Sequence, residues 1–425
     1  MKKTPKSLRL QIGVFGRMNV GKSSFLNLIA NQDVSITSVV PGTTTDVVEK
    51  TMEFHALGPV VFLDTAGVDD STELGVLRRA KTEKAFERCD FVVLLAEADK
   101  WTEHEAEICL KARQNQKPLV IVVNKIDIEE PTEKFITVLR GYSSKIMLCS
   151  CRDNSRRDNY IKTLEENLLN LRTYNLLETP KLIGDLLPKG GLTLLIVPLD
   201  VEAPQGRIKM LQVQTIRDAL DHDCMSMVLK ETDYPKILDS LKTRPDLVIC
   251  DSPVVRHMVE NTPDDIKCTT FSVLMSRYKG DLKEQVIFVE EISSLADGDK
   301  ILIAEACSHH PVEDDIGRSK IPQMIRAFTK KEINFEFFAG REFPQQLDEY
   351  KLIIHCGGCM LTRNEMTNRI SAAQGKKVPI TNYGVVIAYL SGVLERVLSP
   401  FPEARDLYRH AAWAKEEGNV TSGRA

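Results

Sequence analysis

Alternating strand and helix patterns predict an α/β protein with three domains. Short runs of Val, Ile, Leu and Phe recur between charged stretches with helical spacing, and this alternation is typical of doubly wound sheets. The chain has 425 residues, of which 43% are apolar and 27% charged. That length exceeds one ordinary core, and that composition excludes a disordered or collagen-like chain. We expect one larger domain followed by two smaller α/β domains.

The first domain is expected over residues 1–175. Helices are predicted over Ser23–Ala30 and Glu73–Arg88, and a linker over Leu171–Pro180, because a proline discourages continuation of a helix. The predicted strands are Arg9–Phe15, Asp46–Ala56, Val60–Asp64, Phe91–Ala96, Leu119–Asn124 and Lys145–Cys149.

The two smaller domains are expected over residues 181–267 and 268–425. A helix is predicted over Gly206–Leu220, and a charged helix opens the last domain and continues to about Leu295. The predicted strands are Leu192–Pro198, Cys224–Leu229, Leu247–Cys250, Cys268–Val273, Ile301–Ala304, Asn334–Phe338 and Leu352–His355.

Charge and hydropathy exclude two classes of partner. The chain carries 56 Lys and Arg against 60 Asp and Glu, a net charge of −4, and has no block of five or more basic residues. We therefore expect no nucleic-acid binding by bulk electrostatics. No stretch of about eighteen apolar residues is free of charge, and the N-terminus lacks the pattern of a signal peptide. We expect a cytoplasmic protein without a membrane partner, whose ten cysteines stay reduced and more readily hold a metal than form disulfides.

A phosphate-binding motif lies between the first predicted strand and helix. Residues 16–23 read GRMNVGKS, which fits the G-x-x-x-x-G-K-[ST] pattern. Gly16 and Gly21 let backbone amides wrap the phosphates, Lys22 reaches the outer phosphates, and Ser23 binds Mg²⁺. The motif predicts a nucleoside triphosphate site.

Two further motifs follow in order at strand ends. Asp64 begins DTAG, so its carboxylate can reach the metal while the amide of Gly67 approaches the γ-phosphate. Asn124 and Lys125 begin NKID, whose Asp127 carboxylate can accept hydrogen bonds from the N1–H and the amine of guanine. We therefore predict GTP rather than ATP as the ligand.

A threonine-rich segment lies where a first switch loop belongs. Residues 41–46 read PGTTTD, and a threonine here can bind Mg²⁺ and respond to the γ-phosphate. Thr44 is favoured for this role, and Thr43 is the alternative.

Residues 9–170 resemble the GTPases of the Era and TrmE kind. The shared motifs are GRxNVGKSS, which extends to Ser24, together with PGTT, DTAG and NKxD. The resemblance implies GTP hydrolysis with Lys22, Thr44 and Gly67 at the γ-phosphate, and a K⁺ ion held by Asn19. Val68 stands where Ras-like proteins have a glutamine, so we expect slow, K⁺-stimulated turnover.

The base-contacting loop departs from the pattern of these GTPases. An SA dipeptide is expected after the last strand of the domain, and the chain has Cys149-Ser150-Cys151. Ser150 can still serve the guanine base. The two cysteines have no assigned role, and we expect them to be structural rather than ligands.

A second cluster of chemically active residues lies near the C-terminus. Cys307 and His309 follow one predicted strand, and His355, Cys356 and Cys359 end or follow another. Three thiolates with a glycine-rich CxxC suit a [4Fe–4S] cluster. The fourth ligand is left open among His309, His355, an exogenous group and the carboxylates of Glu313, Asp314 and Asp315. A zinc site made by Cys307, His309, Cys356 and Cys359 is the alternative, and a purely structural role is the third.

The GTPase motifs combined with CxH and HCxxC resemble the HydF family of [FeFe]-hydrogenase maturation GTPases across essentially the whole chain. The resemblance implies a central dimerisation domain and a C-terminal domain with a [4Fe–4S] cluster on Cys307, Cys356 and Cys359. It also implies a homodimeric scaffold that accepts a diiron precursor from the radical-SAM maturases HydE and HydG and delivers it to apo-hydrogenase. The competing classes are a ribosome- or tRNA-associated GTPase with a zinc-stabilised C-terminal module, and a GTP-dependent metal-binding regulator without cluster transfer.

Overall fold

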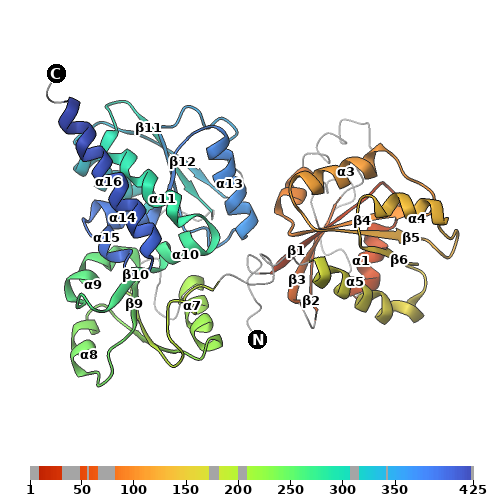
Figure 1. Ribbon diagram of the computed structural model, residues 1–425, viewed down its shortest axis with the longest axis horizontal. Coiled ribbons are helices and arrows are strands. Elements are labelled where there is room, and N and C mark those ends of the chain that lie inside the picture. Colours follow the sequence, from red (N-terminus) through yellow and green to blue (C-terminus); the bar gives the residue numbers. More distant parts are fainter. Residues whose placement is uncertain are drawn as a thin grey trace. The chain divides into compact units, whose positions relative to one another are not determined.

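Two units make up the chain, Met1–Thr179 and Pro180–Ala425. In the computed structural model the described residues are 9–30, 48–54, 57–65, 82–171, 181–199, 208–306, 315–340 and 343–422. Each unit is built from mainly parallel β-sheet with helices packed against it (Figure 1). The predicted α/β class is confirmed.

The first unit contains one six-stranded sheet in the order β2-β3-β1-β4-β5-β6. All neighbouring pairs are parallel except β2 with β3, which are antiparallel. The strands are β1 (Leu10–Phe15), β2 (Val48–Phe54), β3 (Gly58–Asp64), β4 (Phe91–Glu97), β5 (Leu119–Asn124) and β6 (Ile146–Leu148).

Helices cover both faces of this sheet, which explains why its central strands read as continuous apolar runs. One face packs against α1 (Lys22–Ala30) and α5 (Arg157–Leu171). The other face packs against helical residues 82–88, α3 (Glu103–Gln114) and α4 (Glu133–Arg140). Because β1, β3, β4 and β5 are parallel, the carboxyl ends of β1, β3 and β5 share one edge of the sheet. This edge is the position where α/β folds bind ligands.

The second unit begins with a four-stranded parallel sheet in the order β10-β9-β7-β8. Its strands are β7 (Leu192–Ile196), β8 (Met225–Leu229), β9 (Leu247–Cys250) and β10 (Lys267–Thr270). The helices that accompany them are α7 (Met210–Asp221), α8 (Tyr234–Ser240) and α9 (Val255–Asn261).

A second four-stranded parallel sheet follows, in the order β12-β11-β13-β14. Its strands are β11 (Lys300–Glu305), β12 (Asn334–Ala339), β13 (Leu352–His355) and β14 (Ile380–Asn382). The helices are α10 (Phe271–Lys279), α11 (Leu282–Phe288), α12 (Ile321–Thr329), α13 (Arg363–Gly375), α14 (Tyr383–Leu390), α15 (Leu394–Val397) and α16 (Pro402–Ser422).

One hydrophobic core joins the two sheets of the second unit. It runs from Leu182 to Ala404 and includes side chains from both sheets. Helix α10 contacts α7, which accompanies the β10-β9-β7-β8 sheet, and β14 of the β12-β11-β13-β14 sheet. It therefore lies between the two sheets of the second unit (Figure 1). None of the described helices has the length and apolar character needed to cross a membrane.

Two of the expected elements are wrong in detail. The strand predicted over Cys268–Val273 ends at Thr270, whose hydroxyl accepts a hydrogen bond from the amide of Val273 and so begins α10. The charged helix expected as far as Leu295 is broken after Lys279, because Asp281 caps a new helix through the amides of its first turn.

The domain division stays a prediction. Residues 181–267 and 268–425 lie in one unit with a shared core, and the boundary between them falls inside β10, which pairs with β9. The expected linker after Leu171 and residues 73–81 of the predicted helix lie outside the described residues.

Candidate functional site

The phosphate-binding motif forms a tight loop after β1. Gly16 has φ +142° and Gly21 has φ +98°, conformations that favour glycine. A Cβ at Gly16 would lie 2.5 Å from the Leu95 carbonyl, and one at Gly21 would lie 2.4 Å from Nδ2 of Asn124. Inside the loop, Nζ of Lys22 donates hydrogen bonds to the carbonyls of Gly16 and Arg17, both at 2.8 Å. The ammonium is thus placed where the motif needs it, facing the centre of the cradle.

Two of the groups predicted to reach the magnesium ion meet at the edge of the sheet. Ser23 Oγ donates to Asp64 Oδ2 at 2.9 Å, although the residues come from α1 and β3. Asp64 Oδ1 is buried and has no hydrogen-bond partner among the described residues. Burial raises the pKa of the Asp64 carboxyl, while the hydrogen bond from Ser23 opposes this shift. An exposed hydroxyl beside a half-buried carboxylate that keeps one oxygen unused fits a Mg²⁺ ion.

The guanine side of the site joins three loops. Asn124 Nδ2 donates to the carbonyl of Val20 at 2.9 Å, which ties the NKID segment to the phosphate-binding loop. Ser150 Oγ donates to Asp127 Oδ1 at 2.6 Å. The structure thus brings together the two side chains predicted to contact the base, Asp127 and Ser150, from loops that follow β5 and β6.

The two unassigned cysteines stabilise this guanine loop. The thiol of Cys151 lies 3.1 Å from Asn124 Oδ1, which also accepts the Cys151 amide at 3.3 Å. Cys149 is fully buried in the core. The hydrogen bond between the two thiols raises the pKa of Cys149, and burial raises it further. The same hydrogen bond lowers the pKa of Cys151. Both residues therefore have packing and hydrogen-bonding roles, as expected for structural cysteines.

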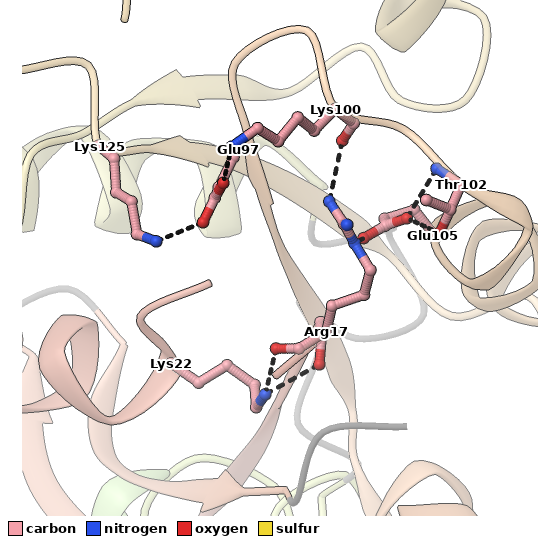
Figure 2. Close-up of polar contacts among 8 residues, drawn as sticks. Arg17, Lys22, Glu97, Lys100, Thr102, Glu105 and Lys125 are labelled. Carbon is pink, nitrogen blue, oxygen red and sulfur yellow. Dashed lines mark hydrogen bonds and ion pairs between the residues drawn. The ribbon is translucent and has the colours of Figure 1, made fainter. Parts of the chain in front are cut away.

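A polar network beside the phosphate-binding loop was not foreseen from the sequence. Figure 2 shows Arg17 donating to Glu105 of α3, whose second oxygen caps the helix through Thr102. In the same view Glu97, the last residue of β4, pairs with Lys125 of the NKID segment. The only sequence signal was the capping pattern T-x-x-E at Thr102, and it gives no hint of the partner Arg17.

Several predicted site residues lie outside the described residues. They are Thr43 and Thr44 of the switch segment, Gly67 of the DTAG motif, and Cys307, His309, Glu313 and Asp314 of the C-terminal cluster. Among the remaining predicted residues, Asn19 is exposed in the loop with φ +61°, and Ser24 is exposed on the first turn of α1.

The CxxC segment is held in place by a buried lysine. Nζ of Lys279, at the end of α10, donates to the carbonyls of Gly358, Cys359 and Leu361 at 2.9, 3.3 and 2.6 Å. Burial lowers the pKa of Lys279 to about 8, and the nearby thiols and Glu365 oppose this shift. Three hydrogen bonds from the Lys279 ammonium therefore hold the loop between Cys356 and Leu361 in place.

Cys356 has the surroundings of a thiolate ligand. Its Sγ accepts hydrogen bonds from the amides of Ala306 at 3.1 Å and Gly358 at 3.4 Å. Burial raises the pKa of the thiol to about 11, and these amides oppose the shift. N–H donors aimed at sulfur stabilise cluster-bound thiolates. The described part of the predicted ligand set thus fits an iron–sulfur cluster, while the described residues, which omit Cys307, contain no group of three metal-binding side chains.

His355 supports this loop through both of its ring nitrogens. Nδ1 lies 2.7 Å from the carbonyl of Cys356, and Nε2 lies 2.8 Å from Nη1 of Arg369. Burial and the neighbouring Arg369 charge lower the pKa of His355 to about 3, so the ring is neutral, with a proton on Nδ1 and a hydrogen bond accepted at Nε2. In this arrangement the ring offers no free nitrogen to a metal. Asp315, another candidate ligand, accepts a hydrogen bond from the Arg318 amide and caps the helical turn that starts at Ile316.

Known families cover most of the chain. A model of the 50S ribosome-binding GTPase family matches residues 11–125. The hydrogen maturase F dimerization domain matches residues 182–280, and the hydrogen maturase F tetramerization domain matches residues 259–400. The two hydrogen maturase F domains together span residues 182–400, just over half of the chain.

Relatives and solved structures match the N-terminal unit. GTPase Der of Chloroherpeton thalassium is 38% identical over 132 residues, which cover 29% of this chain and 30% of that protein. The tRNA modification GTPase MnmE of Synechococcus sp. is 41% identical over 130 residues, 29% of this chain and 27% of that protein. The chain thus spans less than a third of these relatives. The structure of Era with MgGDPNP and a 16S ribosomal RNA fragment has 25% identity, covering 39% of this chain and 57% of that chain, with a TM-score of 0.33.

The nucleotide site, the order of its motifs and the family match define a P-loop GTPase domain in the first unit. The second unit carries the two hydrogen maturase F domains, whose names support self-association of the chain. The chain belongs to the hydrogen maturase F family.

Proposed function

We propose that the chain is a GTP-hydrolysing scaffold that assists assembly of the active-site cluster of [FeFe]-hydrogenase in the cytoplasm. The observation that carries the proposal is the combination, in one chain, of a GTPase site with hydrogen maturase F domains over residues 182–400. The matches to GTPase Der and to the tRNA modification GTPase MnmE each cover 29% of this chain, which is too little to include those domains. The near-neutral charge also gives no support to RNA binding.

In the GTPase part, Lys22 neutralises the β- and γ-phosphates, and Ser23 with Asp64 holds Mg²⁺. Supporting this role, Lys22 already points into its loop and the Ser23–Asp64 pair leaves one buried carboxylate oxygen unused. Thr44, or Thr43 in its place, and the amide of Gly67 would respond to the γ-phosphate. Asn19 would hold K⁺, which supplies positive charge beside the phosphates and would do the work of an arginine finger.

In the C-terminal part, Cys307, Cys356 and Cys359 would hold a [4Fe–4S] cluster. Cys356 directly follows β13 and Cys307 follows β11 by two residues, and these strands are parallel neighbours with Ala304 opposite His355. Parallel neighbours end at the same edge of a sheet, which favours a common site. The fourth position would go to His309, a carboxylate of Glu313 or Asp314, or an exogenous group, since both His355 nitrogens have partners.

The cargo and partners follow from family membership. The scaffold would self-associate, accept a diiron precursor from the radical-SAM maturases HydE and HydG, and pass it to apo-hydrogenase. GTP state would regulate the exchange of partners rather than perform chemistry on iron, because switch loops order around a γ-phosphate and relax after hydrolysis.

Metal analysis of anaerobically purified protein tests the cluster. We expect iron and sulfide, with broad absorption at about 400 nm, as is usual for iron–sulfur thiolates. Cys356→Ser should lose most of this iron, whereas Cys224→Ser should keep it, because Cys224 is a buried thiol of the same unit that bonds only to backbone carbonyls. Stoichiometric zinc in place of iron, or full iron in the Cys356 variant, would contradict the ligand assignment.

GTP turnover in K⁺ and in Na⁺ tests the other half of the proposal. We expect slow hydrolysis by the wild-type protein, and we expect K⁺ to accelerate it. Asn19→Ala should hydrolyse GTP at the same rate in K⁺ and in Na⁺. Equal rates in both salts for the wild type would remove the role given to Asn19 while leaving GTP hydrolysis itself in place.

A further inference from the structure

We propose that two carboxylates, one in the first turn of α3 and one at the end of β4, are positioning residues for GTP: Glu105 for the phosphate-binding loop and Glu97 for the guanine loop. The proposal rests on the GTP binding proposed above. It adds two residues that lie outside every nucleotide-binding motif of the sequence, and it assigns a separate end of the nucleotide to each.

Glu105 is a buried carboxylate whose two oxygens have different partners. Its side chain is fully buried, and Oε1 accepts from Nε of Arg17 at 2.5 Å (Figure 2). Oε2 accepts the amide of Thr102 at 2.9 Å and the Thr102 hydroxyl at 2.5 Å, which completes the capping box of α3. One oxygen therefore holds the loop and the other holds the helix, so their contributions can be separated by mutation.

Arg17 carries this anchor directly into the phosphate cradle. It follows Gly16, and its own carbonyl is one of the two that accept the Lys22 ammonium. Its Nη2 also donates to the carbonyl of Lys100 at 3.3 Å, so its side chain is bound both to α3 and to the loop that precedes α3. Because Gly16 is free to adopt many conformations, we infer that the Arg17 side chain restricts the loop to the form that can receive phosphates.

Glu97 makes the corresponding contact on the guanine side. It stands opposite Asn124 in the β4–β5 pairing and forms an ion pair with Lys125, the next residue. Its other oxygen accepts from Lys100 at 2.7 Å. Lys125 has φ +63°, an uncommon conformation for a lysine. The ion pair therefore stabilises a strained turn two residues before Asp127, the predicted guanine-binding carboxylate.

The experiment compares the affinities of GTP and ITP. ITP lacks the exocyclic amine that Asp127 is predicted to bind, so the ratio of the two affinities reports on the guanine loop, while the affinity for both reports on the phosphate loop. Glu105→Gln removes the acceptor facing Arg17 and can keep its carbonyl on the Thr102 cap. Thr102→Val is the matched control, because it weakens the cap and leaves Arg17 bound. Glu97→Gln is paired with Lys100→Met, which removes only the other partner of Glu97.

We expect Glu105→Gln to weaken GTP and ITP equally, by roughly tenfold, the effect of about one charge-assisted hydrogen bond. Glu97→Gln should lower the preference for GTP over ITP by roughly fivefold on the same scale. Both controls should bind like the wild type. Arg17→Gln removes the same contact from the other side and also the hydrogen bond to the Lys100 carbonyl, so it should weaken binding at least as much as Glu105→Gln. The double variant should bind no more weakly than Arg17→Gln alone, because the contact between the two side chains is already lost in that variant.

Three outcomes would overturn the positioning roles. They are unaltered affinity in both Glu105→Gln and Arg17→Gln, an equal loss in Thr102→Val, and an unchanged GTP-to-ITP ratio in Glu97→Gln. A wild-type protein that binds no GTP would instead contradict the proposed function, so the two failures are distinguishable.

Discussion

Ser23 Oγ donates a hydrogen bond to Asp64 Oδ2 at 2.9 Å, and this contact joins the first turn of α1 to the end of β3. The other carboxylate oxygen of Asp64 is buried without a hydrogen-bond partner among the described residues. The pair is thus arranged for a ligand rather than for the stability of the nucleotide-free protein, because an unmatched buried carboxylate oxygen is costly.

Asp64→Asn should separate stability from function. We expect it to abolish the Mg²⁺ dependence of GTP binding and to raise the free energy of unfolding without nucleotide by about 1 kcal/mol, because an amide is cheaper to bury than a carboxylate. Titration of Mg²⁺ in a GTP-binding assay, together with urea unfolding, measures both effects. Asp158→Asn is the control, since that carboxylate is fully exposed on α5. An unchanged Mg²⁺ requirement in Asp64→Asn would show that Asp64 is no magnesium ligand.

Cys151 should report on nucleotide binding. Its half-buried thiol has a lowered pKa through its hydrogen bond with Cys149 and lies against Asn124 in the predicted guanine loop. We expect iodoacetamide to modify Cys151 in the nucleotide-free protein and GDP to protect it, as followed by mass spectrometry of the peptide. Buried Cys149 should stay unmodified in both states.

Cys151→Ala tests whether that thiol is needed. The backbone amide of Cys151 still donates to Asn124 Oδ1 in this variant, so we expect GTP affinity within about twofold of the wild type. In the labelling experiment on the wild-type protein, modification of Cys151 at the same rate with and without GDP would place the guanine base elsewhere.

His355→Ala should lower stability without removing iron. The ring makes two buried hydrogen bonds, to the Cys356 carbonyl and to Arg369, and we expect a loss of about 2–3 kcal/mol in the free energy of unfolding. Iron per protein after anaerobic reconstitution should equal that of the wild type. His257→Ala, which changes a half-buried histidine on α9, should cost less than about 1 kcal/mol. Loss of one iron per cluster in His355→Ala would make His355 a ligand after all.

Lys279→Met should loosen the CxxC loop. The variant keeps an unbranched side chain one atom shorter and loses three hydrogen bonds to the carbonyls of Gly358, Cys359 and Leu361. We expect iron to be removed by a chelator several times faster than from the wild type, because three anchoring bonds of about 1 kcal/mol each are lost. Arg277→Met, on the same helix but paired with Asp185 at the surface, is the control. Equal rates for the two variants would show that the lysine does not hold the loop.

The strand positions could be predicted because buried parallel strands leave a strong local pattern. β5 (Leu119–Asn124), β9 (Leu247–Cys250) and β13 (Leu352–His355) lie where the apolar runs predicted them. The segment from Cys268 to Val273 misled the prediction, because its β-branched residues fit a strand while the Thr270 hydroxyl caps a helix instead. Capping depends on one hydrogen bond, which composition does not reveal.

The sequence by itself determined the GTPase motifs, since each motif is contiguous and its function depends on backbone groups a few residues apart. Glycine at positions 16 and 21, for example, is required by the loop conformation that the motif encodes. Tertiary structure alone decided which side chains hold these motifs in place. Arg17 and Glu105 are 88 residues apart, and Lys279 and Gly358 are 79 apart. Such contacts depend on how one element packs against another, and no local spacing encodes that packing.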